Sequence, residues 1–554
     1  MNFQKINCFF NTVKYLKPIQ IRSRLYYAMR GKWQKMSGFA YPSSLPSHSA
    51  VLELAPSIPS PVSYRDGTFT FLNLSHTFEN RIDWNHAGYG KLWTYNLTYF
   101  DFLQQEGIST DAGLALIRDF IDQSKSVKDG LEPFPISLRG INWIKFLTRH
   151  DIKEQAIDDS LYAQYCRLMD NLEYHLLGNH LLENGFSLLF GAYYFQDEKF
   201  YAKAKDILES ELEEQVLSDG AHFELSPMYH QIMLYRVLDC LNLVQNNPWM
   251  AVASQQSIAD SRWLMEFLEK KAVKMLGWLN AITYENGDIP LLNDSANGIA
   301  PTTAQLNDYA ARLQLNHISH PEPDSGSMEA NRFRIKSGMT ILKESGYRKY
   351  QNGSYECVID IGPIGPDYIP GHAHADTFNF ELSLNTQHSK LKTSSVPFIV
   401  DTGLSTYETG KRRDIERSTS AHNTVEVEGK NSSEVWGGFR VAERAKIVEL
   451  KEEGNVVTAT HDGYKKFGIL HTRIWRFDKD KIIIEDVLSK ECSAVARLHF
   501  HPDVTEEMIK KHITINHRLS TIDSYDYASE FNKTQKALVM EIPFTKELKV
   551  EIIL

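Results

Sequence analysis

The sequence has few cysteines, and they follow no pattern. Its 554 residues include five, which are odd in number, far apart and never in a CxxC pair: Cys8, Cys166, Cys240, Cys357 and Cys492. A disulfide framework needs paired cysteines, and a thiolate zinc site needs closely spaced ones. The sequence therefore argues against both kinds of site.

A long apolar run is missing as well. Near the start of the chain, Lys5, Lys14 and Lys17 interrupt each apolar stretch. A secretory signal contains an uninterrupted apolar stretch, and a membrane span needs a longer one. We therefore expect neither a signal peptide nor a membrane span, and we expect a cytoplasmic location.

The chain also has no excess of positive charge. Its formal net charge is −10, which offers no basic field to nucleic acid or to another polyanion. We expect no nucleic-acid partner. An acidic substrate would need a local cluster of arginines.

What the chain does have is the composition of a large globular protein. Hydrophobic residues make up 42% and charged residues 23%, which argues against global disorder. At about 100–200 residues per domain, the length suggests two to four domains. Aromatic residues, at 11%, suit a protein that stacks rings against sugars, although large cores also use them.

Helical patterns occupy the first part of the chain. Residues 1–90 are mixed, with a short basic helix at about 19–36 followed by a loop-rich stretch of proline and serine. Residues 91–320 show helical apolar spacing without a strand pattern between the helices. Helices are expected at 111–125, 160–178, 185–195, 198–217, 227–245 and 257–279. So many antiparallel helices favour a helical barrel or toroid.

Strand patterns occupy the rest of the chain. Proline, glycine and serine at 321–327 mark a linker. Short strand patterns separated by turns then run from 328 to 554. The second part is therefore expected to be an antiparallel β-sandwich.

The sequence GHAHADTFNFELSL at 371–384 places two histidines directly before an alternating apolar pattern. If the strand begins at the histidines, His372 and His374 share one face of the sheet. That spacing suits a metal site, or one metal ligand beside one base. The alternative is a pair of surface histidines with ordinary hydrogen bonds.

Two further stretches, in the helical half, carry polar side chains suited to proton transfer. In LGNHLLEN, Asn179 and His180 are expected where a helix ends, and capping is the alternative role for such a pair. In DGAHFELSPMYH, Ser226 and the following proline mark a helix start, which puts Tyr229 in the first turn. The helix dipole there would favour a tyrosinate, and His230 is a neighbouring base. The alternative for Tyr229 is a ring that lines the barrel.

Aromatic and amide side chains gather in two segments, 92–101 and 135–143. Rings of this kind stack on sugars, and amide or guanidinium groups bind hydroxyls or a carboxylate. The candidates for substrate binding are Trp93, Tyr95, Asn96, Arg139, Asn142 and Trp143. The alternative is aromatic packing inside the helical barrel.

A metal set can be assembled from three segments of the β half. Asp401 ends an apolar strand, and His422 follows a basic run. With His374 they provide nitrogen, oxygen and nitrogen ligands, a combination that zinc accepts.

Together these stretches resemble the heparinase II/III-like polysaccharide lyases. The matching signatures are GNH at 178–180, DGxxxExSPxYH at 219–230, HAHAD at 372–376 and RSTSAHNTV at 417–425. Each motif is weak alone, but the four in order are specific and span nearly the whole chain from about residue 90. The resemblance implies an incomplete (α/α) toroid at 91–320 followed by an antiparallel β-sandwich at 328–554, with the active site between them.

The resemblance also implies β-elimination on an acidic polysaccharide or oligosaccharide. A base removes the C5 proton of a uronic acid, an acid protonates the leaving O4, and a 4,5-unsaturated sugar forms. Asn179, with His180 as a second candidate, would neutralise the C6 carboxylate. Tyr229 would protonate the glycosidic oxygen and is also a candidate base, and His372 would be the other base.

Further expectations follow from the same resemblance. Three residues that lie inside the matching signatures are expected to bind substrate: Glu224, His230 and Arg417. His374, Asp401 and His422 match a metal-binding triad, which implies a structural Zn²⁺; a catalytic zinc with an open position is the alternative. Secreted or periplasmic relatives make the periplasm the alternative location.

Two other functions remain open from the sequence. An inverting glycoside hydrolase on a helical toroid would need two opposed carboxylates, drawn from Asp219 or Glu224 with Asp288 or Asp294. A non-catalytic polysaccharide-binding or assembly protein would bind substrate without turnover. An unsaturated product distinguishes a lyase from both.

Overall fold

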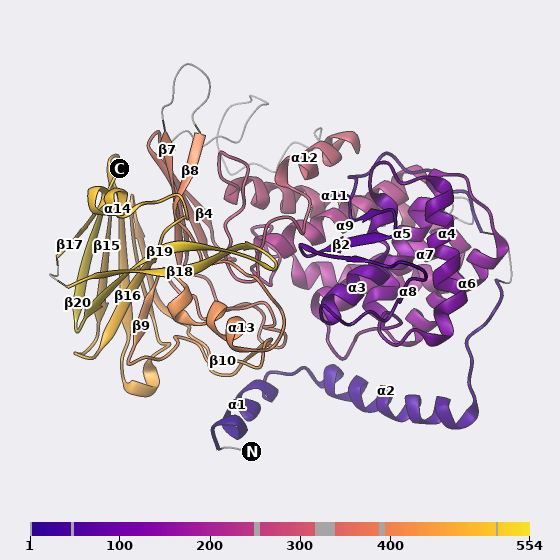
Figure 1. The fold of residues 1–554 in the computed structure, drawn as a ribbon, viewed down its shortest axis with the longest axis horizontal. Helices are drawn as coiled ribbons and strands as arrows, with labels where there is room; N and C mark the ends of the chain where they lie inside the picture. Colours follow the sequence, from indigo (N-terminus) through magenta and orange to yellow (C-terminus); the bar gives the residue numbers. More distant parts are fainter. Residues whose placement is uncertain (1–2, 46–48, 249–254, 316–337, 387–393, 517–518) are drawn as a thin grey trace.

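Two bodies of different secondary structure lie side by side in the computed structural model (Figure 1). The structure describes residues 3–45, 49–248, 255–315, 338–386, 394–516 and 519–554. We call residues 50–315 the helical body and residues 338–554 the β body. The helical body contains α3 (Lys91–Tyr99), α4 (Thr110–Gln123), α5 (Pro133–Arg149), α6 (Gln155–Asp170), α7 (Gly178–Phe195), α8 (Glu198–Gln215), α9 (Pro227–Asn246), α11 (Gln255–Ile282) and α12 (Thr303–Arg312).

The start of α9 agrees with its sequence signal. The Ser226 side chain accepts a hydrogen bond from the Tyr229 backbone N–H, and proline occupies the first helical position. The cap satisfies an amide that would otherwise lack a partner, and the proline has no N–H to satisfy. Tyr229 is therefore in the first turn, as predicted.

The predicted helix at 160–178 is wrong at its end. Helix α6 stops at Asp170, and α7 begins at Gly178. Leu177 and Gly178 both have positive φ, so the chain reverses there and starts a new helix. A glycine of this kind is more often found after a helix, which is why the sequence suggested a C-terminus. Asn179 and His180 thus lie in a first turn, with their backbone N–H groups toward the helix N-terminus.

The N-terminal segment has more structure than the sequence suggested. Helices α1 (Phe3–Val13) and α2 (Pro18–Ser37) come first, and α2 agrees with the predicted basic helix. A small antiparallel sheet follows, made of β1 (Tyr64–Arg65), β2 (Thr68–Phe71) and β3 (Leu74–Thr77). Asp66 and Gly67 form its first turn. Asp-Gly is a known hairpin signal, and the prediction of a loop-rich stretch did not include it. Phe71 packs on Trp93, so this sheet belongs to the helical body.

The β body consists of antiparallel sheets that share an apolar core. Strands β4 (Gly338–Leu342), β5 (Tyr347–Gln351), β6 (Tyr355–Asp360), β7 (Phe380–Thr386) and β8 (Ser394–Ile399) form one sheet. A second contains β18 (Thr521–Glu530), β19 (Lys533–Phe544), β16 (Ala494–His499) and β9 (Val425–Val427). The third contains β12 (Ile447–Glu453), β13 (Val456–His461), β14 (His471–Phe477), β15 (Lys481–Leu488), β20 (Glu547–Ile553) and β17 (Ile513–Ile515). Smaller elements are β10 (Val435–Trp436), β11 (Arg440–Val441), α13 (Lys411–Glu416) and α14 (Glu506–His512).

This order confirms the predicted helical half followed by an antiparallel β half, but one strand is shorter than expected. Strand β7 begins at Phe380, because Phe378 has a φ of 72° and breaks the extended chain. His372 and His374 therefore lie in the loop before the strand. The predicted linker at 321–327 and the domain start at 328 fall outside the described residues.

Hydrogen bonds join the two bodies at the loop that precedes α9. The Tyr347 hydroxyl, on β5, donates to the Leu225 carbonyl at 2.5 Å. The Ser345 N–H donates to the Asp219 carboxylate at 2.8 Å. These contacts hold the start of α9 against the β body. Within the described part of the chain, no helix combines the length and apolarity of a membrane span.

Candidate active site

His372 and His374 contact the two oxygens of one carboxylate, that of Asp294, but differ in exposure to solvent. Nδ1 of His372 lies 2.9 Å from Oδ2 of Asp294, and Nε2 of His374 lies 2.7 Å from Oδ1. The His372 side chain is 13% exposed, whereas that of His374 has no exposed surface. His372 therefore keeps some exposed surface, whereas His374 is fully enclosed beside the same carboxylate.

Asp294 is in turn fixed by Arg413. The two terminal guanidinium nitrogens donate to the two carboxylate oxygens at 2.5 and 2.7 Å. Burial alone would raise the pKa of Asp294, but Arg413 and the two histidines hold it well below its usual range. The carboxylate therefore stays charged and accepts a hydrogen bond from His372 Nδ1–H. This leaves Nε2, which lies 3.5 Å from the Asn179 amide nitrogen, as the ring nitrogen available to act as a base.

This arrangement does not supply the acid and base of a hydrolase. Asp294 is held as a carboxylate by Arg413, and Asp219 accepts hydrogen bonds from the Ser345 N–H and hydroxyl. Asp288 is exposed in a turn, bonded to Asn286. Of the four candidates, Glu224 and Asp294 lie beside His372, at 3.8 and 2.9 Å. Because Asp294 is already paired with Arg413, this group offers no second free carboxylate of the kind that inversion needs.

Tyr229 stacks on His372. Their ring centroids are 3.8 Å apart with an interplanar angle of 30°, and the Tyr229 hydroxyl lies 3.1 Å from that of Tyr407. Burial raises the pKa of Tyr229, against a smaller opposing effect of the Tyr407 hydroxyl. The expected tyrosinate is thus wrong for this structure, because burial outweighs the helix dipole. Tyr229 is a neutral phenol, which suits a proton donor.

Asn179 joins the group from the first turn of α7. Its Nδ2 donates to Glu224 Oε2 at 3.0 Å and lies 3.5 Å from His372 Nε2. Its Oδ1 and the other Glu224 oxygen are buried without a hydrogen-bond partner. Burial raises the pKa of Glu224, although His372 and His180 oppose this. We call Asn179, Glu224, Tyr229, His372 and Tyr407 the His372 cluster.

Gly178 allows Asn179 this position. The φ of Gly178 is +59°, and a Cβ there would lie 3.0 Å from Ile369 Cδ1 and 3.3 Å from Glu224 Oε1. A side chain would therefore be strained in backbone and would push the two bodies apart. This accounts for the glycine in GNH.

His180 lies at the edge of the cluster. Its Nδ1 is 3.2 Å from Glu173 Oε1, and its ring packs on Phe134 at 4.8 Å. Burial would lower the pKa of His180, but Glu173 outweighs this and raises it. The side chain is 36% exposed, so it can present positive charge to an anionic ligand.

Most of the proposed sugar platform is buried. Trp93, Arg139 and Trp143 have no exposed surface, and Asn142 is 2% exposed. Arg139 donates to the Thr98 and Gly130 carbonyls at 2.9 Å. These four assignments to substrate binding are wrong for this structure, because the side chains fill the core of the helical body. The sequence could not reveal this, since core and platform use the same residue types.

The other proposed substrate contacts have mixed positions. Tyr95 and Asn96 are half-buried and keep some surface, so their assignment stays a prediction. His230 is 1% exposed, is bonded to the Met275 carbonyl, and has a pKa lowered by burial to about 3. Arg417 is 1% exposed and donates to the Ala373 carbonyl. His230 and Arg417 are therefore buried behind the site and do not offer their side chains to a substrate. Arg417 instead fixes the backbone at Ala373, between the two histidines.

His374, Asp401 and His422, the predicted metal triad, lie close to one another inside the β body. His422 Nδ1 and Asp401 Oδ2 are 2.7 Å apart, a hydrogen bond that leaves no room for an ion between them. His374 Nδ1 and His422 Nε2 are buried without partners, and the two rings are 5.3 Å apart. Two unpaired ring nitrogens suit zinc. Even so, the described residues contain no group of three or more His, Cys, Asp or Glu side chains placed to hold a metal.

Four residues outside the predicted set support the cluster: Glu173, Asp294, Tyr407 and Arg413. Tyr407 and Arg413 follow Asp401 in and beside the basic run that precedes His422, and the sequence offers Asp294 only as a candidate hydrolase carboxylate. Nothing in the sequence linked Asp294 to residues about 80 and 120 positions away, because only folding brings them together.

Comparison with known proteins bears on the family and the fold. A profile described as heparinase II/III N-terminus matches residues 141–313, and one described as heparinase II/III-like, C-terminal, matches residues 334–537. The two profiles lie in the expected order and together span most of the chain. The chain belongs to the heparinase II/III-like family of polysaccharide lyases. No curated protein sequence matches it.

Solved structures share the fold of this family member at low sequence identity. A heparinase III crystal structure is 15% identical over 97% of this chain and 92% of its own, with a TM-score of 0.63. The heparan sulfate lyase HepC from Pedobacter heparinus is 16% identical over 88% and 81%, with a TM-score of 0.52. The heparinase III BT4657 gene product is 15% identical over 86% and 82%, with a TM-score of 0.54. They support the predicted toroid-plus-sandwich fold.

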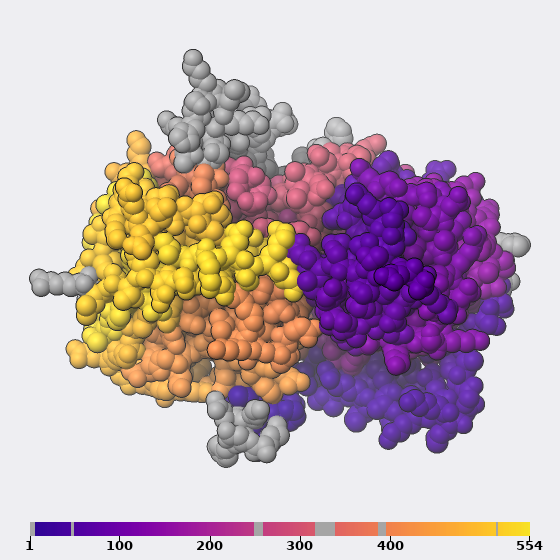
Figure 2. Space-filling model, in the orientation of Figure 1, coloured from indigo at the N-terminus to yellow at the C-terminus, as the bar shows by residue number. Residues whose placement is uncertain are grey.

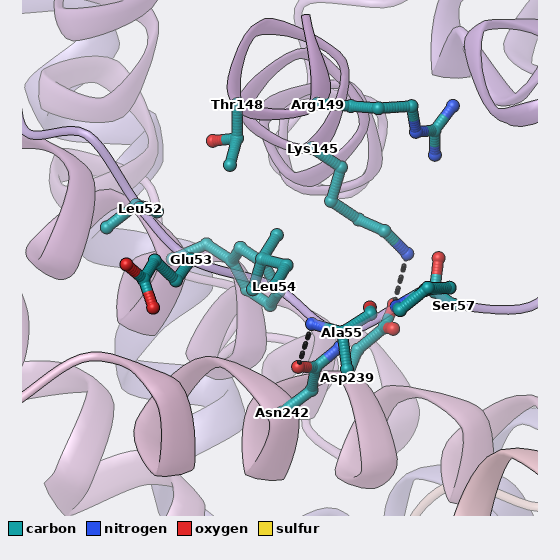
Figure 3. A pocket seen from close by; sticks show the side chains of 12 residues that line it. Leu52, Glu53, Leu54, Ala55, Ser57, Lys145, Thr148, Arg149, Asp239 and Asn242 are labelled. Carbon is teal, nitrogen blue, oxygen red and sulfur yellow. Dashed lines mark hydrogen bonds and ion pairs between the residues drawn. The ribbon is translucent and has the colours of Figure 1, made fainter. Parts of the chain in front are cut away.

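A cavity of about 470 Å³ lies elsewhere in the helical body (Figure 3). The segment 52–57 lines it together with Lys145, Asp239 and Asn242. Lys145 points to Asp239 at 2.8 Å, and Asn242 bonds to the backbone of Ala55. None of its lining residues belongs to the His372 cluster. We therefore assign the chemistry to the cluster, where a base, a proton donor and an amide converge, and not to this cavity.

Proposed function

We propose that this family member cleaves a uronic-acid-containing polysaccharide by β-elimination. One observation carries the proposal: Asn179 and Tyr229, from the helical body, meet His372, from the β body, with Tyr229 and His372 in ring contact. The site thus offers an amide, a phenol and an imidazole at one point between the bodies. These are the groups that elimination beside a carboxylate requires.

Each group has a separate step in the proposed reaction. The C5 proton is only weakly acidic, and negative charge grows on the adjacent carboxylate as the proton leaves. The Asn179 amide would donate a hydrogen bond to that carboxylate, with positive charge from His180 nearby. His372 Nε2 would accept the C5 proton, since Nδ1 is occupied by Asp294. The neutral Tyr229 phenol would protonate O4 as the bond to it breaks.

The test of this proposal is the product. We expect purified protein incubated with a panel of uronate polysaccharides to release fragments that carry the ultraviolet absorbance of an unsaturated uronate. New reducing ends without that absorbance would show hydrolysis and contradict the proposal. Binding of a polysaccharide without fragments, unchanged in Tyr229→Phe, would support a binding or assembly role instead.

We also propose a structural zinc held by His374, Asp401 and His422, away from the proton transfers. Freshly purified protein should contain about one zinc per chain by elemental analysis, as a closed structural site does. His374→Ala should lose this metal and lower the free energy of unfolding by about 1–3 kcal/mol, because it also leaves a buried Asp294 oxygen with one partner fewer. His372→Ala, the matched control, should keep the metal. Wild-type protein without zinc would contradict the proposal.

A further inference from the structure

Helix α2 faces the protein with its polar side. Gln20 Nε2 donates to the Leu176 carbonyl at 3.0 Å, and Arg24 donates to the His175 carbonyl at 3.1 Å. Tyr27 and Arg30 donate to the Leu172 and Asp170 carbonyls further along the same loop. Residues 20, 24, 27, 30 and 34 recur at helical spacing, so they form one face. Polar side chains thus attach α2 to the loop between α6 and α7.

The opposite face of α2 is apolar and uncovered. Its large side chains are exposed by 44% at Ile21, 62% at Leu25, 66% at Met29, 57% at Trp33 and 81% at Met36. Their spacing of four, four, four and three residues places them on one stripe. A helix on the surface of a globular protein normally turns its apolar stripe inward. In α2 the orientation is reversed, because the apolar stripe is the exposed side. Helix α2 lies along the outer edge of the molecule (Figures 1 and 2).

The charge around this stripe is of one sign. Residues 1–52 contain eight lysines and arginines and no aspartate or glutamate, although the whole chain has a net charge of −10. Arg22, Lys32 and Lys35 are exposed on or beside the stripe. A surface that complements α2 would therefore offer an apolar region to the stripe and negative charge to the basic residues that flank it.

We propose that the outward stripe of α2, with its flanking basic residues, docks on a membrane that contains anionic lipids. An interfacial helix has this composition: tryptophan and other apolar residues on one face, with lysine and arginine beside them to meet headgroups. A second copy docked symmetrically through the same stripe would oppose like charges. The helix lies on the bilayer and does not cross it.

Docking would place the membrane beside the His372 cluster. Leu176, whose carbonyl accepts the hydrogen bond from Gln20 of α2, is three residues before Asn179 in the first turn of α7. Helices α1 and α2 together form an N-terminal arm, residues 3–37. At α1 this arm contacts the β body, where the Trp436 indole donates to the Thr12 hydroxyl at 3.1 Å. The arm therefore spans both bodies. The inference does not depend on the proposed lyase activity.

Vesicle flotation with the full chain tests the proposal. We expect wild-type protein to float with phosphatidylcholine vesicles that contain phosphatidylglycerol, to bind pure phosphatidylcholine at least about tenfold more weakly, and to be released by salt. A stripe variant should weaken vesicle binding at least about tenfold; it carries Leu25→Gln, Met29→Gln and Trp33→Gln. A charge variant should weaken binding to anionic vesicles by at least about the same factor; it carries Arg22→Gln, Lys32→Gln and Lys35→Gln. Ile341→Gln/Val448→Gln, which removes similarly exposed apolar residues from the β body, should bind as wild type.

Several outcomes would overturn the proposal. Equal vesicle binding by the stripe variant and the wild type would contradict it. So would wild-type protein that binds vesicles equally with and without phosphatidylglycerol. A wild-type dimer without lipid binding, converted to monomer by the stripe variant in light scattering, would assign the face to a second copy. If the triple variant does not fold, judged by circular dichroism, the single Met36→Gln variant gives the same comparison at the most exposed position, where it should still weaken binding.

Discussion

Replacement of Tyr229 by phenylalanine is expected to reduce kcat by about 10²–10⁴-fold, the usual contribution of a positioned acid or base. The substitution removes one hydroxyl, while the ring keeps its contact with His372 at 3.8 Å. The buried phenol is neutral because its pKa is raised, so the lost group is a proton donor. The rate of unsaturated-product formation measures the effect, and a thermal melt checks that the fold is kept.

Two neighbouring tyrosines make the Tyr229 experiment specific. Tyr235→Phe, six residues further along α9, removes a hydroxyl outside the His372 cluster and should leave kcat near wild type. Tyr407→Phe removes the only hydroxyl that the described residues place against that of Tyr229, at 3.1 Å, and should have a smaller effect than Tyr229→Phe. Near-normal activity in Tyr229→Phe with loss in Tyr407→Phe would transfer the role of acid to Tyr407.

Replacement of His372 by alanine should also reduce kcat by about 10²–10⁴-fold, through loss of the base. Asp294 would keep its bonds to His374 and Arg413, so the fold and the melting temperature should change little. The space left beside Asp294 should admit free imidazole. We therefore expect added imidazole to restore part of the rate in His372→Ala, measured by the unsaturated product.

The control for this second experiment is another half-buried histidine. His150, at the end of α5, has its ring nitrogen 3.0 Å from the Thr110 hydroxyl and lies outside the His372 cluster. His150→Ala should retain wild-type kcat and show no response to imidazole. If His372→Ala were fully active, His372 would be removed from the mechanism and the base would have to be sought elsewhere in the cluster.

Local signals in the sequence were enough for the outline of this protein. Helical spacing and strand alternation depend on neighbours a few residues apart, so the order of a helical half and a β half could be predicted. The Ser226 cap is equally local, and it placed Tyr229 in a first turn. Three of the four motifs contain members of the His372 cluster, namely Asn179, Glu224, Tyr229 and His372, whereas Tyr407 lies outside the motifs. The zinc set remains a prediction.

Only the tertiary structure decided which side chains reach the site. Trp93, Arg139 and Trp143 have the chemistry of a sugar platform but fill the core, because burial depends on contacts from distant segments. The division of labour between His372 and His374 depends on Asp294 and Arg413, which the chain brings from 78 and 41 residues away from His372. The outward stripe of α2 has the same cause: the sequence predicted only a short basic helix, and folding determined that its polar face would be turned inward.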